Sequence, residues 1–258
     1  MVTTTILGCG TSTGVPVIGC KCKVCRSKNP RNKRLRSAVW FQTRGKSLLV
    51  DTGPDFRQQA LRAKIDHLDA VLYTHPHADH SHGIDDLRAY NFFQKEPIPI
   101  YGHDWTVRDF QKKFPYAFSM VDSEGGGLPQ LDLKPFDPEV KTLEIFGVPV
   151  IPLACSHGSQ SCVGYRIDSV AYVTDTSYIP PSTLDRMQGL SVLILDCVRI
   201  EPHRTHLNID RALEMVTAIG AKKTFLTHLG HDFDYTEWSR KLPKGVHLAY
   251  DGLKLKTD

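Results

Sequence analysis

The sequence predicts an α/β protein arranged as a four-layer sandwich, in which two sheets are enclosed by outer helices. Two observations predict this fold. Short apolar runs rich in β-branched residues alternate with helix-like segments along the 258-residue chain. Both halves of the chain show this strand-then-helix pattern, which fits two β-rich halves covered by helices. Because a chain of this length can bury a substantial core, we expect a single domain over residues 1–258.

The first half of the chain is expected to hold strands at apolar runs and helices in the segments that follow them. The expected strands are 3–8, 38–43, 47–51, 70–74 and 98–101. The expected helices are 55–63, 84–94 and 104–114. The glycine-rich segment 122–129 has the composition of a flexible surface loop.

The second half repeats the pattern without an internal repeat or a low-complexity linker. Its expected strands are 141–153, 163–173, 192–196, 223–227 and 247–250. Its expected helices are 181–188, 209–219 and 235–241.

Composition is that of a globular protein in water. Hydrophobic residues make up 41% of the chain and charged residues 23%. No apolar run reaches the roughly 18 residues of a membrane helix, and the first residues lack the basic region of a signal peptide. We therefore expect a cytoplasmic protein without a membrane partner. Seven cysteines, an odd number, argue against a disulfide framework.

The segment 74–80 is the most informative part of the chain. It places His75, His77, Asp79 and His80 between an apolar strand and an expected helix. Imidazole and carboxylate groups suit Zn²⁺, Mn²⁺ or Fe. Four such groups on one turn cannot all reach one ion comfortably, so the segment favours two adjacent metal ions.

The spacing His-x-His-x-Asp-His resembles the signature of the metallo-β-lactamase superfamily, which has an αββα sandwich and a dinuclear metal site. Four further motifs occur in the family's order: 48–53 with Asp51, 156–158 with His157, 172–176 with Asp175, and 225–229 with His228. The resemblance implies that Asp51 orients the histidine loop and that Asp175 bridges both ions. The implied ligands of one ion are His75, His77, His157 and Asp175. Those of the other ion are Asp79, His80, Asp175 and His228.

A second cluster consists of three cysteines, Cys20, Cys22 and Cys25. Three thiols within six residues indicate a metal site when cysteines are reduced. Since the resemblance assigns His228 to the catalytic pair, His231 is free to close a four-ligand zinc site. Such a site has no open position, so its role would be structural, in a loop at about 20–36. The alternatives are a cysteine-rich loop without metal and a redox pair.

The cysteine loop narrows the resemblance. Together with the segments 14–20, 97–102 and 204–206, it is similar to the phosphoribosyl cyclic phosphodiesterase family of the carbon–phosphorus lyase pathway, in the tRNA 3′-processing branch of the superfamily. That likeness implies that His206 acts at the phosphate and protonates the leaving oxygen. The alternative for His206 is an ordinary surface histidine. Asp79, His206 and Asp51 are thus the residues expected to act in catalysis.

The expected function is hydrolysis of a small, cyclic phosphodiester by a hydroxide that two Mn²⁺ or Zn²⁺ ions generate. A nucleotide-like substrate is the expected partner, RNA is less favoured, and a homodimer is left open. Ten Lys or Arg residues between 21 and 46 form either a phosphate-attracting segment or a solvated face. Three alternatives remain: a tRNA 3′-end endonuclease, although its long basic arm is missing; a thioesterase; and a non-catalytic protein of the pyrroloquinoline quinone type.

Overall fold

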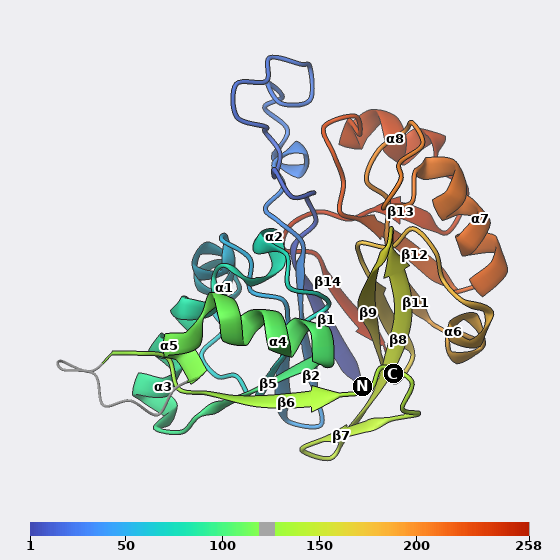
Figure 1. The fold of residues 1–258 in the computed structure, drawn as a ribbon. Helices are drawn as coiled ribbons and strands as arrows, with labels where there is room; N and C mark the ends of the chain where they lie inside the picture. The colour runs from blue at the N-terminus through green and yellow to red at the C-terminus, as the bar shows by residue number, and fades with distance from the viewer. Residues whose placement is uncertain (119–126, 258) are drawn as a thin grey trace.

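The computed structural model describes residues 1–118 and 127–257, which form two seven-stranded sheets packed face to face (Figure 1). The first sheet has the strand order β14-β1-β2-β3-β4-β5-β6. Its strands are β1 (Val2–Gly8), β2 (Ala38–Thr43), β3 (Lys46–Val50), β4 (Ala70–Leu72), β5 (Ile98–His103), β6 (Leu131–Phe136) and β14 (Lys254–Thr257). Strands β3 to β6 are parallel to one another.

The second sheet has the order β13-β12-β11-β10-β9-β8-β7. Its strands are β7 (Leu143–Ile145), β8 (Val148–His157), β9 (Gln160–Ile167), β10 (Val170–Val173), β11 (Val192–Asp196), β12 (Lys223–Thr227) and β13 (Val246–Leu248). Strands β10 to β13 are parallel, and β7 to β9 extend the sheet as antiparallel neighbours.

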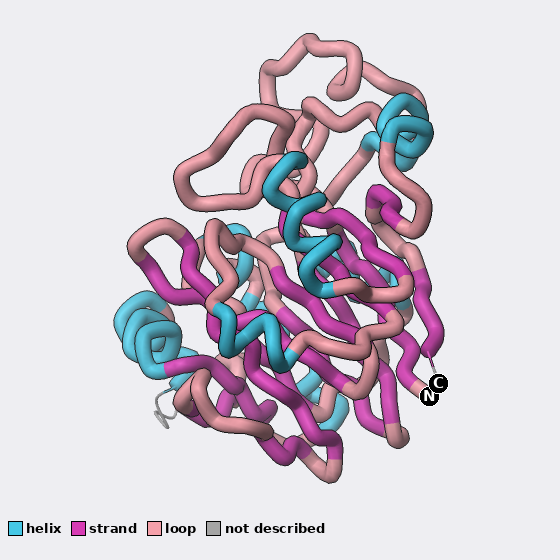
Figure 2. The backbone as a smooth tube through the Cα atoms, turned by 90° about the vertical axis from the view of Figure 1, so that its right-hand side faces the viewer, coloured by secondary structure: helices cyan, strands magenta, loops and turns pink. Residues whose placement is uncertain are grey.

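Helices cover the outer face of each sheet (Figures 1 and 2). The first sheet packs against α1 (Phe56–Ala63), the 3₁₀ turn η2 (Ile84–Leu87), α3 (Arg88–Gln94), α4 (Asp104–Lys113) and α5 (Pro115–Phe118). The second packs against α6 (Pro181–Arg186), α7 (Ile209–Ile219) and α8 (Tyr235–Lys241). A third apolar cluster, which includes Phe41 and Tyr165, fills the space between the sheets. The predicted four-layer α/β sandwich is confirmed.

Two predicted strands are wrong as single elements, because each contains a turn. The segment 141–153 bends at Phe146 and Gly147, whose φ values of 51° and 80° reverse the chain between β7 and β8. The segment 163–173 bends at Asp168, with φ of 50°, between β9 and β10. The helix predicted at 84–94 begins as η2 before α3. Edge strands β6 and β14 were not predicted, and part of the loop predicted at 122–129 lies outside the described residues.

The connection between β1 and β2 projects from the sandwich and approaches the β12–α8 segment (Figure 1). It contains the short 3₁₀ helix η1 (Pro30–Asn32) and the predicted cysteine loop. The buried Arg34 anchors it, donating hydrogen bonds to the carbonyls of Gly230 (2.9 Å) and Phe233 (2.5 Å). In the described ranges, no helix combines the length and apolarity needed to cross a membrane.

Candidate active site

The predicted site residues lie where strands of both sheets end. Asp51 follows β3, the short helix α2 (Ala78–Ser81) follows β4 with the histidine motif, and His157 ends β8. Asp175 follows β10, and His228 follows β12. Because these strands run in the same direction within each sheet, their carboxyl ends meet at one edge of the sandwich. The fold thereby brings together side chains that are up to 177 positions apart in sequence, from Asp51 to His228.

Three of these residues turn the chain sharply out of their strands. Asp51, Asp175 and His228 have φ values of 67°, 54° and 57°, in the left-handed region that non-glycine residues seldom occupy. Such conformations cost on the order of 1–3 kcal/mol each and concentrate at functional sites.

The first group of converging side chains consists of His75, His77 and His157, whose ligand atoms lie within 4.8 Å of one another. Nε2 of His75 is 2.9 Å from Nδ1 of His77 and 3.9 Å from Oδ1 of Asp175. Nδ1–H of His157 donates to the carbonyl of Thr205 at 2.8 Å, which leaves Nε2 of His157 with its lone pair.

The second group consists of Asp79, His80, Asp175 and His228. Nε2 of His80 is 3.2 Å from both Asp79 and Asp175, and Nε2 of His228 is 3.4 Å from Asp175 and 3.7 Å from Asp79. A tetrahedral ion about 2.0–2.1 Å from each ligand would separate the ligand atoms by about 3.4 Å. The observed separations therefore match the spacing that one metal ion requires.

The electrostatics of this group also fit a cation. Nε2 of both His80 and His228 is buried without a hydrogen-bond partner among the described residues. Burial alone would lower the pKa of His80, but the carboxylates of Asp175, Asp79 and Asp51 outweigh it and raise that pKa well above its usual value. Burial likewise works to raise the pKa of Asp175, yet the rings of His228 and His80 hold it well below its usual range. These carboxylates and imidazoles form a donor set suited to divalent ions.

Asp51 contacts the ring nitrogen of His80 that points away from Asp79 and Asp175. Its carboxylate is fully buried and accepts hydrogen bonds from Nδ1–H of His80 at 2.7 Å and from the amide and hydroxyl of Thr74 at 2.9 Å each. Burial raises the pKa of Asp51, against the pull of the His80 ring. The hydrogen bond between Nδ1 of His80 and Asp51 fixes a proton on Nδ1 and directs Nε2 of His80 toward Asp79 and Asp175.

His206 lies at the site, where its ring stacks on that of His228 with centroids 4.8 Å apart. Its Nδ1 is 3.5 Å from Oδ1 of Asp196, a residue that none of the sequence motifs contains. Asp196 is fully buried and also lies 3.5 Å from Nδ1 of His228. Burial would lower the pKa of His206, but Asp196 outweighs it and raises the pKa. The available signal was the apolar run of β11, which ends in an aspartate just as 48–51 does.

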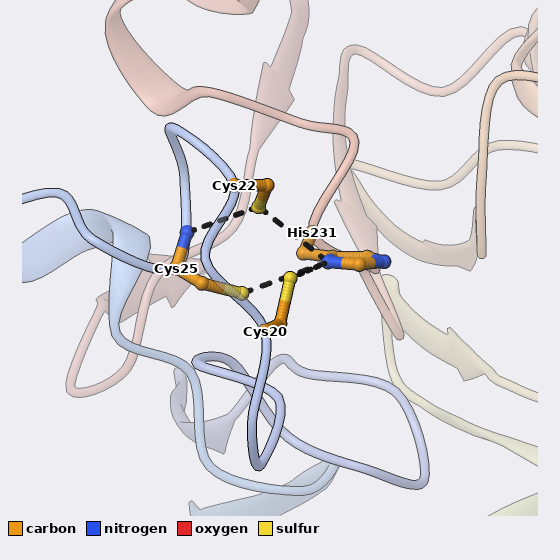
Figure 3. A group of neighbouring side chains, drawn as sticks. All are labelled: Cys20, Cys22, Cys25 and His231. Atoms are coloured by element: carbon orange, nitrogen blue, oxygen red, sulfur yellow. Dashed lines mark hydrogen bonds between the residues drawn. The ribbon is translucent and has the colours of Figure 1, made fainter.

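The three cysteines of the predicted cluster surround the ring of His231 (Figure 3). Nδ1 of His231 is 3.3 Å from Sγ of Cys20 and 3.6 Å from Sγ of both Cys22 and Cys25. Tetrahedral zinc with sulfur at about 2.3 Å and nitrogen at about 2.0 Å would set this spacing near 3.5 Å. The amide of Cys25 donates to Sγ of Cys22 and lowers the pKa of that thiol to about 6, while burial raises the pKa of Cys25 to about 11. The group therefore suits one zinc ion.

Three cations of the basic segment 21–46 have partners within the fold or are buried in it. Arg34 is buried, Arg36 pairs with Asp55 at 3.0 Å, and Lys46 pairs with Asp69 at 2.9 Å. These three side chains therefore contribute to the structure of the protein.

Comparison with known proteins agrees with this geometry. The model of the Beta-lactamase superfamily domain matches residues 46–229. An octanoyltransferase of Porphyromonas gingivalis is 36% identical over 257 residues, which cover 98% of this chain and 51% of that protein, so the chain spans about half of that relative's length. The probable metallo-hydrolase YhfI of Bacillus subtilis is 28% identical over 233 residues, covering 84% of this chain and 87% of YhfI.

A solved structure gives a closer likeness. It is the crystal structure of a new diphosphatase from the PhnP family, with 42% sequence identity, a TM-score of 0.91, and coverage of 98% of this chain and 96% of that one. The present chain belongs to the beta-lactamase superfamily, and it is similar to metal-dependent hydrolases of that superfamily. Within that superfamily its resemblance is to the PhnP family.

Proposed function

We propose that this protein is a dinuclear phosphodiesterase that hydrolyses a small, cyclic phosphodiester. The observation that carries the proposal is the position of Asp175, which belongs to the second group and lies 3.9 Å from His75 of the first group. Nδ1 of His206 also lies 3.9 Å from the Asp175 carboxylate. Asp175 would bridge two divalent ions, Mn²⁺ or Zn²⁺, with His75, His77 and His157 on one side and Asp79, His80 and His228 on the other. When bound, the two ions would lower the pKa of a water molecule and neutralise charge on the phosphate oxygens.

The remaining steps fall to the side chains. His206, whose pKa Asp196 raises, would donate a proton to the departing alkoxide as a general acid. Asp196 would orient His206, and Asp51 would hold His80 in the tautomer that binds metal. Cys20, Cys22, Cys25 and His231 would hold a separate structural zinc that tethers the β1–β2 connection to the segment after β12.

A phosphodiester suits this site better than a monoester does. A monoester carries more negative charge and offers no second ester group for the site to hold. The likeness to a diphosphatase of the PhnP family favours a substrate that contains a phosphoryl group. It also makes the P–O–P bond of a diphosphate a second candidate for the bond that is hydrolysed. The cytoplasm is our proposed location, because none of the seven cysteines forms a disulfide, as expected in a reducing compartment.

A second candidate is hydrolysis of an acyl thioester on the same metal groups. The observation that favours it is the match of nearly the whole chain to half of an octanoyltransferase. A thiolate leaves without a proton, so this reaction would make little use of His206.

A substrate screen separates these functions. Protein loaded with Mn²⁺ or Zn²⁺ would be assayed on ribose 1,2-cyclic phosphate, a 2′,3′-cyclic nucleotide, bis(p-nitrophenyl) phosphate, a dinucleoside diphosphate, p-nitrophenyl phosphate, octanoyl-CoA and precursor tRNA. We expect the cyclic diesters to be hydrolysed fastest and the monoester slowly. Good hydrolysis of octanoyl-CoA without activity on any diester would refute the proposed substrate class.

A further inference from the structure

Trp105 lies at the edge of the histidine cluster, in the first turn of α4. Its ring is half-buried and meets the ring of His77 edge-on, with centroids 6.5 Å apart. His77 is itself half-exposed and belongs to the first ligand group. A large aromatic surface therefore borders the proposed metal pair on the side of His77.

The indole of Trp105 is held in place but keeps its polar edge free. The buried ring of His103 lies 5.7 Å from it at an interplanar angle of 30°. Burial lowers the pKa of His103 to about 4, so this neighbouring ring is neutral near pH 7. Within the described ranges, the indole N–H of Trp105 donates to no other group. The ring is thus supported by the fold while part of it faces solvent.

The other two tryptophans differ from Trp105 in their surroundings. Trp40 is only 5% exposed and donates its indole N–H to Ser47 at 2.8 Å, as a core residue does. Trp238 is half-buried like Trp105, but it packs on Phe233, with Lys241 5.1 Å from its ring centroid. Neither contacts the rings of the ligand groups, so Trp238 is a matched control for Trp105.

A cation accompanies the aromatic ring. Arg108 lies three residues after Trp105 on α4, a spacing that places both side chains on neighbouring positions of one helix face. Arg108 is exposed, and no ion pair joins it to the described part of the chain. An aromatic ring beside a free guanidinium can accept a planar ring and an anionic group together.

We propose that Trp105 is a specificity-determining residue that stacks on a planar, nucleobase-type ring of the substrate. The inference rests on the proposed phosphodiesterase function and narrows its substrate class to nucleotide-like phosphodiesters. The scissile phosphate would lie at the ligand groups, with the base on the exposed face of the indole. Every nucleobase has an aromatic face, so stacking would favour a base over none without selecting one base.

Kinetics on two substrates that differ in the base test this role. Adenosine 2′,3′-cyclic phosphate carries a base, and ribose 1,2-cyclic phosphate does not. We expect Trp105→Ala to lower kcat/KM for the adenosine substrate by about 5- to 150-fold, the range typical of one stacked base, mainly through KM. The ribose substrate should change by about twofold at most, and Trp105→Phe should recover most of the loss. Equal losses on both substrates, or none on either, would overturn the proposal.

A binding measurement separates this proposal from the proposed reaction. In the Mn²⁺-loaded protein, adenosine 2′-phosphate should quench tryptophan fluorescence, whereas ribose 5-phosphate should not. The quench should persist in Trp238→Phe and disappear in Trp105→Phe. If the wild type hydrolyses neither cyclic substrate but shows this pattern, the proposed reaction fails and the stacking role stands. If quenching by adenosine 2′-phosphate is absent, or survives in Trp105→Phe, the stacking role is refuted.

Discussion

Replacing Asp51 by Asn should weaken metal binding without unfolding the protein. Asn is the residue closest in size, and it tolerates the left-handed conformation that Asp51 adopts, with φ of 67°. Its carbonyl oxygen can still accept the amide hydrogen of Thr74, now 2.9 Å from Asp51. Its amide hydrogens, however, would face the nitrogen of His80 that now donates at 2.7 Å. The substitution therefore changes the hydrogen-bond pattern while it leaves the shape intact.

The consequence follows from the tautomer of His80. Facing an amide donor, Nδ1 of His80 must accept, and the proton moves to Nε2, the atom within 3.2 Å of Asp79 and Asp175. That proton occupies the position a metal ion needs. Loss of such an orienting partner typically costs about 10- to 100-fold in metal affinity, which corresponds to about 1.4–2.8 kcal/mol. Loss of the charge-assisted hydrogen bond should also lower the apo-protein's stability by about 1.5–3 kcal/mol.

Calorimetric titration of Mn²⁺ into chelator-treated protein measures the affinity, and urea unfolding of the apo-protein measures the stability. The matched control is Asp69→Asn. The carboxylate of Asp69 likewise accepts a backbone amide, from Ser47 at 2.8 Å, and the Lys46 ammonium at 2.9 Å, outside the ligand groups. This control should lose stability but keep its Mn²⁺ affinity. Unchanged Mn²⁺ affinity in Asp51→Asn would refute the tautomer argument.

Three further substitutions test other parts of the site. His206→Ala should cut turnover by about 100-fold or more for diesters with alkoxide leaving groups, but much less for p-nitrophenolate, which leaves without a proton; equal losses would show that His206 is not the acid. Asp175→Ala should lose catalytic metal by elemental analysis while its circular dichroism stays native, and a fully metallated, active variant would contradict the bridging assignment. Cys22→Ser should release the tightly bound zinc and lower the melting temperature more than it changes turnover at saturating substrate, whereas unchanged zinc content would exclude the four-ligand site.

The side chains that converge in the two groups could be predicted from sequence because each motif is local. Every strand that presents one of these side chains is an apolar run, and the motif lies at or directly after its end. The likeness to a known superfamily then supplied the pairing between motifs. His231 was predicted by elimination, and the structure places it 3.3 Å from Cys20, although 211 positions separate them.

The residues of the site that the sequence does not reveal are brought there by strand pairing between distant segments. Asp196 ends a buried strand with no histidine motif beside it, and only the parallel pairing of β11 with β12 sets it next to His228. Trp105 reaches His77 because β5 pairs with β4, and no local pattern around Trp105 indicates that neighbour. The apolar run 141–153 does not reveal the hairpin at Phe146, because a bulky residue with positive φ is uncommon.

We propose that two divalent ions, held by the two ligand groups that meet at Asp175, support phosphodiester hydrolysis. The most direct test of this proposal is stepwise reconstitution of the chelator-treated protein, whose structural zinc is retained, with activity on ribose 1,2-cyclic phosphate measured against Mn²⁺ bound per chain. We expect negligible activity without added Mn²⁺ and a plateau at two bound ions. Full activity at one bound ion, or without any added metal, would contradict the proposal.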